Sequence, residues 1–312
     1  MTPRNIVMWL TSVEDPKRAG FLTSGSVAYH RFFKKISERD NFRFAYNKDS
    51  YKGGGVFSNV AKYINGKIVG SNEDFTADVI YQFSTLTEPG FNPSPAVITN
   101  TPDFRKFCIS KIVSYEYMPQ FYPTTFLVFN IENALSKVAT INSDKVVLKP
   151  NKGEGGEGVT IVERGDFNCN LLNVKTLEKH GYIIQEFIDT SIGIPNIATT
   201  VHDLRITTHG EKISLCLIRE PKRGSLVSNV HQGGTATEVD IDKIPDFIMD
   251  FYCKVHKEIT KIHPRPLYNM DMGVGKNGPK LIELNSNTAF PDASFKCMDR
   301  FIDNLIEHLE TI

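Results

Sequence analysis

Closely spaced cysteine pairs are absent from this sequence of 312 residues. Its five cysteines are dispersed singly and form no C-x-x-C motif: Cys108, Cys169, Cys216, Cys253 and Cys297. Zinc ribbons and small disulfide-bonded domains need paired cysteines, so an odd, scattered set favours free thiols in a reducing compartment. A long hydrophobic run is also missing near the N-terminus, where apolar residues 6–10 soon give way to charged ones. Such a run is too short for a signal peptide or a membrane span, and we expect a cytoplasmic protein.

An excess of either charge is equally absent. The chain has 36 Lys and Arg against 36 Asp and Glu, which gives a formal net charge of zero. Proteins that bind nucleic acid or anionic membranes through their overall field carry a basic excess. The balance therefore predicts neither nucleic acid nor membrane as a partner and is compatible only with a local basic patch.

Three catalytic signatures are missing as well. The chain has no G-x-x-x-x-G-K-[ST] phosphate loop, no G-x-S-x-G elbow, and no two histidines at the i, i+4 spacing of H-E-x-x-H. The sequence therefore does not indicate a P-loop enzyme, a serine hydrolase with this elbow or a zinc protease with this motif. The histidines considered as metal ligands or bases are interpreted as structural or surface residues: His30, His202, His231, His256 and His263.

The length and the apolar content, 40% of the residues, fit two or three small domains with real cores. Short apolar runs alternate with helical patterns over the first hundred residues, which predicts a small parallel α/β domain. A proline-rich stretch at residues 89–95 marks its end. We predict an N-terminal domain over residues 1–98, a central subdomain over 99–184 and a C-terminal subdomain over 185–312.

Later segments mix strands, hairpins and helices. We predict a helix over 103–117, strands over 146–150, 159–162 and 182–188, and a hairpin over 205–219 that turns at residues 209–211. A helix over 246–262 is expected to bury Phe247, Phe251, Val255 and Ile259, which recur every four residues. A second hairpin turns around Asn277-Gly278, and a closing helix covers 300–309.

A glycine-rich loop follows the strand that ends at Lys149-Pro150. Four glycines fall within six positions, Gly153 to Gly158, between two predicted strands. Glycines let the backbone approach a bulky anion and point N–H groups at phosphate oxygens, and Lys149 adds a positive charge. A phosphate-binding loop and an ordinary glycine-rich hairpin are both consistent with this segment alone.

The last predicted hairpin gathers hard oxygen ligands. Counting back from its turn places Asp271 opposite Glu283 to within one residue, and period two puts Asn285 on the same face as Glu283. Two carboxylates and an amide oxygen suit Mg²⁺, and the opposed carboxylates would repel each other without a cation. The alternative is a solvated hairpin face, but the neighbours of Glu283 in the strand are apolar.

A third set of residues carries cationic and amide groups. Arg205 and Arg219 border the first hairpin, and Ser228-Asn229 opens a segment that ends in two glycines. Arginines in such places suit bidentate phosphate contacts. Surface ion pairing, such as Arg219 with Glu220, is the competing interpretation.

Taken in order, these motifs resemble the ATP-grasp superfamily, within it the RimK-like glutamate ligases and their glutathione-synthetase relatives. The resemblance spans about residues 100–291. Its five motifs are V-L-K-P with the glycine loop at 147–158, Q-E-F-I at 185–188, D-L-R at 203–205, S-N-V-H-Q-G-G at 228–234 and I-E-L-N-S-N at 282–287. It implies an α/β ATP-grasp fold, in which an N-terminal α/β domain precedes two α+β subdomains that clasp ATP.

The resemblance also implies roles for matching residues. The nucleotide would be bound by Lys111, Lys149, Gly155, Gly156, Gln185, Glu186, Phe187, Ile188, Asp203, Ser228 and Asn229. The catalytic residues would be Arg219, which steadies the acyl phosphate, together with Arg205 and Asn229. The metal would be held by Asp271, Glu283 and Asn285. Lys106 competes with Lys111 for the first lysine position, and the interval from Ile188 to Asp203 is longer than the family pattern.

The implied reaction is ATP-dependent and needs Mg²⁺ or Mn²⁺. A carboxylate would attack the γ-phosphate of ATP, and an amine would then displace phosphate from the acyl phosphate to form an amide. The partners would be small-molecule or peptide carboxylates and amines, with a homo-oligomer expected by analogy with relatives. An ATP-grasp kinase acting on a hydroxyl and a nucleotide-binding regulatory module without turnover are the alternatives.

Overall fold

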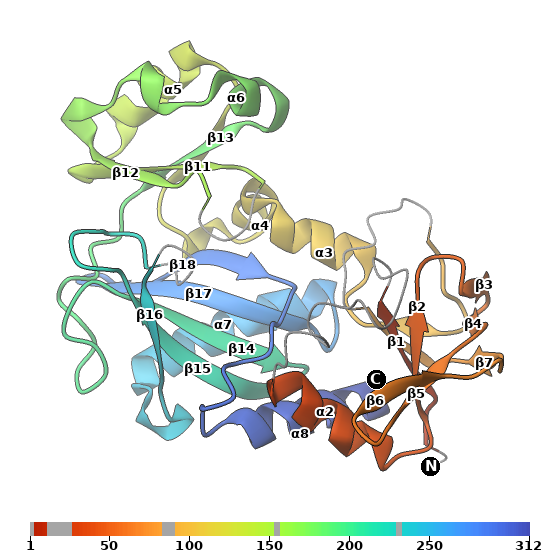
Figure 1. Cartoon of the computed structure of the whole chain (residues 1–312). Coiled ribbons are helices and arrows are strands. Elements are labelled where there is room, and N and C mark those ends of the chain that lie inside the picture. The colour runs from red at the N-terminus through yellow and green to blue at the C-terminus, as the bar shows by residue number, and fades with distance from the viewer. Residues whose placement is uncertain (1–2, 11–26, 83–90, 153–156, 229–232) are drawn as a thin grey trace.

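The computed structural model describes residues 3–10, 27–82, 91–152, 157–228 and 233–312. Three regions are visible in Figure 1: an N-terminal sheet, a small upper sheet with two short helices, and a larger sheet between them. No helix in the described part of the chain combines the length and the apolar character that crossing a membrane requires.

The N-terminal sheet has the order β6-β5-β2-β1-β8-β9. Its parallel core consists of β1 (Ile6–Leu10), β2 (Phe42–Tyr46), β8 (Val79–Gln82) and β9 (Val97–Ile98), and the antiparallel β5 (Ala61–Ile64) and β6 (Lys67–Gly70) extend it. Strand β1 is buried on both faces, as a central parallel strand must be. The predicted parallel α/β core is confirmed. A three-stranded antiparallel sheet, β3 (Tyr51–Gly53), β4 (Val56–Phe57) and β7 (Phe75–Thr76), was not predicted.

Helix α8 (Met298–Thr311), at the far end of the chain, completes the N-terminal core. Ile302 and Leu305 of α8 pack in one apolar cluster with Phe32 of α2 (Val27–Ser37) and Ile6 of β1. The two helices lie side by side in Figure 1. The first and last segments of the chain therefore share one hydrophobic core, so the N-terminal domain is packed onto the rest of the molecule.

The central region is an antiparallel sheet of order β10-β13-β11-β12. Its strands are β10 (Thr125–Val128), β11 (Lys145–Pro150), β12 (Thr160–Glu163) and β13 (Tyr182–Glu186), and α5 (Ile131–Thr140) and α6 (Val174–His180) pack against them. Strand β13 ends two residues earlier than predicted. Residues 187 and 188 belong instead to the segment that leads into the larger sheet.

The helix predicted over 103–117 is two helices, α3 (Pro102–Ile109) and α4 (Lys111–Tyr117). Ser110 between them is extended, with φ −87° and ψ 104°. The N–H groups of Lys111 and Ile112 donate to the backbone and side-chain oxygens of Asn151 at 3.3 and 3.2 Å. This contact anchors the start of α4 beside the end of β11 and explains a break that local propensity does not encode.

The larger sheet is antiparallel with the order β16-β15-β14-β17-β18. Its strands are β14 (Asp203–His209), β15 (Lys212–Glu220), β16 (Thr235–Glu238), β17 (Leu267–Gly275) and β18 (Gly278–Asn285). Both predicted hairpins are confirmed. Short 3₁₀ turns occur at Pro119–Phe121, Arg164–Asp166, Cys169–Leu171 and Ile241–Lys243.

Helix α7 (Asp246–Ile262) lies against the larger sheet, but its buried stripe differs from the prediction. The buried residues are Ile248, Tyr252, Val255 and Ile259, whereas Phe247 is 47% exposed. A strict spacing of four residues drifts around a helix of 3.6 residues per turn, so the stripe alternates steps of four and three.

Candidate functional site

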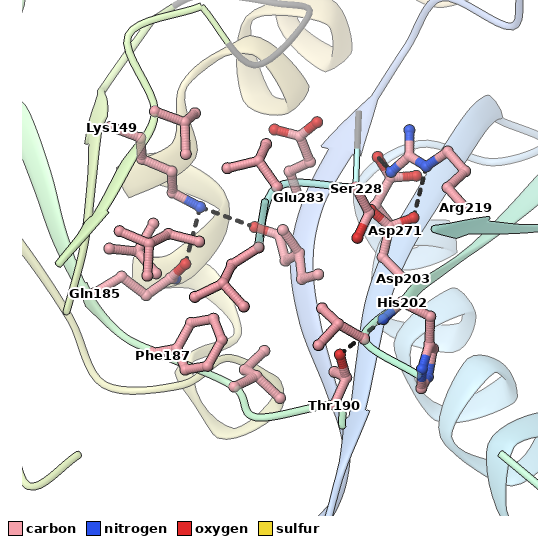
Figure 2. Close-up of a pocket in the computed structure, with 18 of the residues that line it drawn as sticks. Lys149, Gln185, Phe187, Thr190, His202, Asp203, Arg219, Ser228, Asp271 and Glu283 are labelled. Atoms are coloured by element: carbon pink, nitrogen blue, oxygen red, sulfur yellow. Dashed lines mark hydrogen bonds and ion pairs between the residues drawn. The ribbon is translucent and has the colours of Figure 1, made fainter. Parts of the chain in front are cut away.

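The main pocket lies between the central sheet and the larger sheet. Figure 2 shows side chains from both sheets pointing into it, with the segment after β13 along one side. Its lining includes charged and polar residues from both walls: Lys111, Lys149, Gln185, Glu186, Thr190, His202, Asp203, Arg219, Ser228, Asp271 and Glu283. Apolar residues complete it: Val147, Val159, Ile161, Phe187, Ile188, Val201, Leu226, Val227 and Ile282. The pocket thus combines an apolar lining with charged residues at one end.

Lys149 connects the two walls of this pocket. Its ammonium donates to Gln185 Oε1 at 2.9 Å on the neighbouring strand and to the carbonyl oxygen of Ile282 at 3.2 Å on β18. Gln185 in turn donates from Nε2 to Thr125 Oγ1 at 2.7 Å. Burial lowers the pKa of Lys149 to about 8, although Glu283 opposes the shift. A cation held by two neutral acceptors in a buried position is suited to an anionic ligand.

The carbonyl of Ile282 is available because β18 has a bulge. Asp271 is paired with Glu283 and Met272 with Leu281, so Ile282 has no partner residue on β17. Bulges of this kind re-aim groups next to active sites. The predicted opposition of Asp271 and Glu283 is confirmed.

Four charged residues form a connected cluster on the larger sheet. Arg219 donates from Nε to Asp203 Oδ1 at 2.5 Å and from Nη2 to Asp271 Oδ2 at 2.9 Å. Arg205 makes a bidentate contact with Asp271, at 2.7 Å to Oδ1 and 2.6 Å to Oδ2. Burial of Asp271 opposes its ionisation, but the two arginines lower its pKa to about 2. Asp271 is therefore an ionised carboxylate at 0% exposure.

This cluster corrects two arguments made from the sequence. Arginine side chains, rather than a cation alone, compensate the charge of Asp271 opposite Glu283. Arg219 does not pair with Glu220 at the surface, because it is 8% exposed and bound to Asp203 and Asp271. Side-chain partners across three strands are not visible in a linear pattern.

Glu283 and Asn285 lie together on β18, as the period-two argument predicts. Asn285 donates from Nδ2 to Glu283 Oε1 at 3.1 Å. Within the described ranges, no three His, Cys, Asp or Glu side chains gather as a metal site. A cation here would rely on two carboxylates, Asp271 and Glu283, and on the amide oxygen of Asn285. Such a set of hard oxygens fits Mg²⁺, which keeps several waters and shares phosphate oxygens.

The segment Glu186–Ile188 follows the edge of the pocket. The N–H of Glu186 donates to Thr124 O at 2.9 Å, and the N–H of Phe187 donates to Ser143 Oγ at 3.3 Å. These two N–H groups are engaged within the protein, which fixes the path of the segment beside the apolar part of the lining.

The sequence did not single out Thr190, and it assigned His202 to the structural histidines. The long interval between Ile188 and Asp203 folds back on itself, with a bridge between Ile194 and Ala198. The backbone N–H of His202 then donates to Thr190 Oγ1 at 3.0 Å, and both residues line the pocket. The unusual length of that interval was the only sequence signal.

The remaining predicted residues divide into two groups. Lys111 lines the pocket, whereas its competitor Lys106 is exposed on α3. Gly155, Gly156 and Asn229 lie outside the described residues. The roles assigned to individual residues by resemblance stay predictions.

Residues 110–252 match the model of the ATP-grasp domain of prokaryotic glutathione synthetase. This stretch, a little under half of the chain, is similar to an ATP-grasp domain. A probable alpha-L-glutamate ligase of Stenotrophomonas maltophilia is 21% identical over 234 residues, which cover 75% of this chain and 73% of that protein. A glutathione synthetase of Vibrio parahaemolyticus is 29% identical over 209 residues, which cover 67% of this chain and 61% of the relative.

Solved structures agree on the ATP-grasp fold. D-alanyl-alanine synthetase A of Vibrio cholerae superposes with a TM-score of 0.62 at 12% identity, over 99% of this chain and 98% of that one. The ATP-grasp ligase PsnB, complexed with a minimal precursor, gives a TM-score of 0.61 at 13% identity, over 98% and 99% of the two chains. The predicted ATP-grasp fold and the assignment to the ATP-grasp ligases are confirmed.

Proposed function

We propose that this ATP-grasp protein activates a carboxylate with ATP and joins it to an amine, releasing ADP and phosphate. The observation that carries the proposal is the pocket in which Lys149, from the central sheet, faces Glu283, Asp271 and Arg219, from the larger sheet. A triphosphate at this end would meet positive charge from both walls. The apolar lining beside Glu186–Ile188 would take the adenine ring.

Charge neutralisation is the main chemical task of the site. A carboxylate and the γ-phosphate repel each other, so attack requires cations that are already in place. Lys149 would hold the phosphates, and Arg219 would stabilise charge on the transferred phosphoryl group and on the intermediate that the amine forms. Because Asp203 and Asp271 fix Arg219 before substrates bind, little reorganisation is needed during the reaction.

Asp271, Glu283 and Asn285 would hold Mg²⁺ on the same side of the pocket. When bound, Mg²⁺ supplies charge neutralisation and orientation for the phosphate oxygens. The proposed metal is Mg²⁺ rather than Mn²⁺, since a related ATP-grasp ligase has been solved with Mg and ADP.

The proposed substrates are amino acids or peptides. Sequence relatives are named glutamate ligase and glutathione synthetase, and structural neighbours include a ligase with a leader and core peptide. All of these names refer to the joining of amino acids or to peptide partners, which supports substrates of the same chemical class for this chain.

The proposal is tested by measuring ADP release with Mg²⁺ and ATP across a panel of amino acids and short peptides. We expect release that depends on both an acid and an amine, and mass spectrometry should find a product lighter by one water than its two substrates combined. Hydroxylamine supplied in place of the amine should trap the acyl phosphate as a hydroxamate. A stable phosphoester, or no acid-dependent release across the panel, would contradict the proposal.

A further inference from the structure

Arg105 of α3 is a buried cation whose described contacts are all uncharged. Its side chain is 7% exposed, and it donates from Nε to Asn100 O at 3.0 Å and from Nη2 to Gln82 O at 3.2 Å. Nη1 donates to no residue that the structure describes. The titratable groups near the guanidinium are the Tyr81 phenol and the Cys108 thiol, neither of which is a carboxylate.

A second buried arginine in the same chain has different neighbours. Arg43 of β2 is 8% exposed and also donates to backbone carbonyls, those of Asp40 at 2.7 Å and Phe42 at 2.9 Å. Unlike Arg105, it has the carboxylates of Glu73 and Asp40 as electrostatic neighbours. Burying an uncompensated charge is costly, so a buried guanidinium with no carboxylate neighbour among the described residues suggests a partner that arrives from outside.

The position of Arg105 relates it to the main site. Gln82 is the last residue of β8, and ligands of parallel sheets bind beyond the carboxyl ends of the strands. Asn100, which accepts from Arg105, donates from Nδ2 to the carbonyl of Ser286 at 2.7 Å. Ser286 directly follows Asn285, so a short hydrogen-bonded chain ties the guanidinium to the end of the strand that carries Glu283.

A small cavity and further polar groups lie near Arg105, which does not itself line the cavity. The cavity lies between α3 and β18 and is lined by Cys108, one turn from Arg105, together with Lys111, Glu283 and Asn285. Thr288, in the segment after β18, is a polar neighbour of Tyr81. The N-terminal sheet and the segment before α3 thus surround the cation with uncharged polar groups, near the proposed phosphoryl-transfer centre.

We propose that Arg105 binds a carboxylate of the amino-acid or peptide substrate, distinct from the carboxylate that ATP activates. A guanidinium matches a carboxylate with paired N–H donors, and a desolvated contact of this kind strongly favours the free acid over its neutral amide. The reaction assumed for that substrate rests on the proposed function, whereas binding at Arg105 does not require turnover. The site would therefore select amino acids or peptides with a free carboxylate.

Binding can be measured without catalysis. Thermal-shift and calorimetric titrations would compare wild type, Arg105→Met and Arg105→Lys with amino acids and short peptides, each supplied as free acid and as carboxamide, in the presence of Mg²⁺ and AMPPNP. Arg43→Met is the matched control, because it removes an equally buried arginine from a different part of the N-terminal sheet. Arg105→Lys retains the cation if the Met variant folds poorly.

We expect some free acids to stabilise wild type while their carboxamides do not. Arg105→Met should weaken the binding of those acids by 10-fold or more, and Arg105→Lys should weaken it by less. Arg43→Met should bind the acids as wild type does, and all three variants should bind AMPPNP as wild type does. The proposal would be overturned if wild type bound free acids and their carboxamides equally well. It would also be overturned if Arg105→Met bound the acids as tightly as wild type does, or if wild type bound no free acid. If wild type did not bind AMPPNP, that result would instead contradict the proposed function. The acid titrations would still test the role of Arg105.

Discussion

Arg219 joins Asp203 to Asp271 through two different nitrogens, at 2.5 and 2.9 Å. The three residues come from three adjacent strands, β15, β14 and β17, so the larger sheet itself sets the distance between them. This geometry makes Asp203 a positioning residue for Arg219 as well as part of the pocket lining.

Asp203→Asn tests that relationship. The amide loses the charge that fixes Arg219, so we expect kcat to fall about 10- to 100-fold, while the dissociation constant of AMPPNP changes less than about twofold. Steady-state kinetics and calorimetry measure the two effects. Asp240→Asn, which breaks an exposed pair with Lys243, is the control. Unchanged kcat with weakened nucleotide binding would make Asp203 a nucleotide ligand, as the resemblance implies.

Lys149→Met should weaken nucleotide binding. The variant keeps the apolar stem and removes a buried ammonium, and a charge-assisted contact of about 1.5–3 kcal/mol corresponds to about 10- to 100-fold in affinity. Titration calorimetry with AMPPNP and Mg²⁺ gives the dissociation constant. Lys145→Met removes a partly exposed lysine from the same strand, paired with Glu163 at 2.6 Å, and should bind normally. Equal affinity of the two variants would remove Lys149 from the phosphate site.

Two buried histidines should make the fold sensitive to acid. His209 and His308 are 2% and 5% exposed, and burial lowers their pKa values to about 3 and about 4. Because these folded pKa values lie below the unfolded value of about 6.5, the unfolded chain binds more protons, and stability is lost as the pH falls below about 6.5. Each histidine should lower the free energy of unfolding by about 2 kcal/mol between pH 7 and pH 5.

Denaturant unfolding of wild type and His308→Gln at several pH values measures this loss. The variant should lose the part of the acid dependence that His308 contributes. Identical pH profiles for the two proteins would show that His308 is not buried in its neutral form.

The parts of the site that sequence reasoning predicted are those set by local rules. A tight turn fixes the register of its hairpin, so the turn near Gly278 was enough to place Asp271 opposite Glu283. The lysine on β11 could be identified because a strand directly precedes a glycine-rich loop. In both cases the determining signal lies within a few residues of the functional side chain.

The parts that could not be predicted depend on distant contacts. Asn151 interrupts the helix at Ser110, and α8 fills a core whose other members come mostly from the first third of the chain. The pairing of Arg205 with Asp271 joins residues 66 positions apart. Since such contacts leave no periodic signal, only the folded chain shows that arginines already neutralise Asp271.

The central claim is that Mg²⁺ and the triphosphate meet between Lys149 and the β17–β18 hairpin. The most direct measurement is a crystal structure of the protein with Mg²⁺ and AMPPNP, alongside the same soak of Glu283→Gln. We predict density for a metal at Asp271, Glu283 and Asn285, with the phosphates against Lys149, and a reduced or absent metal in the variant. Phosphates bound away from Lys149, or a metal retained fully without the Glu283 carboxylate, would contradict the account.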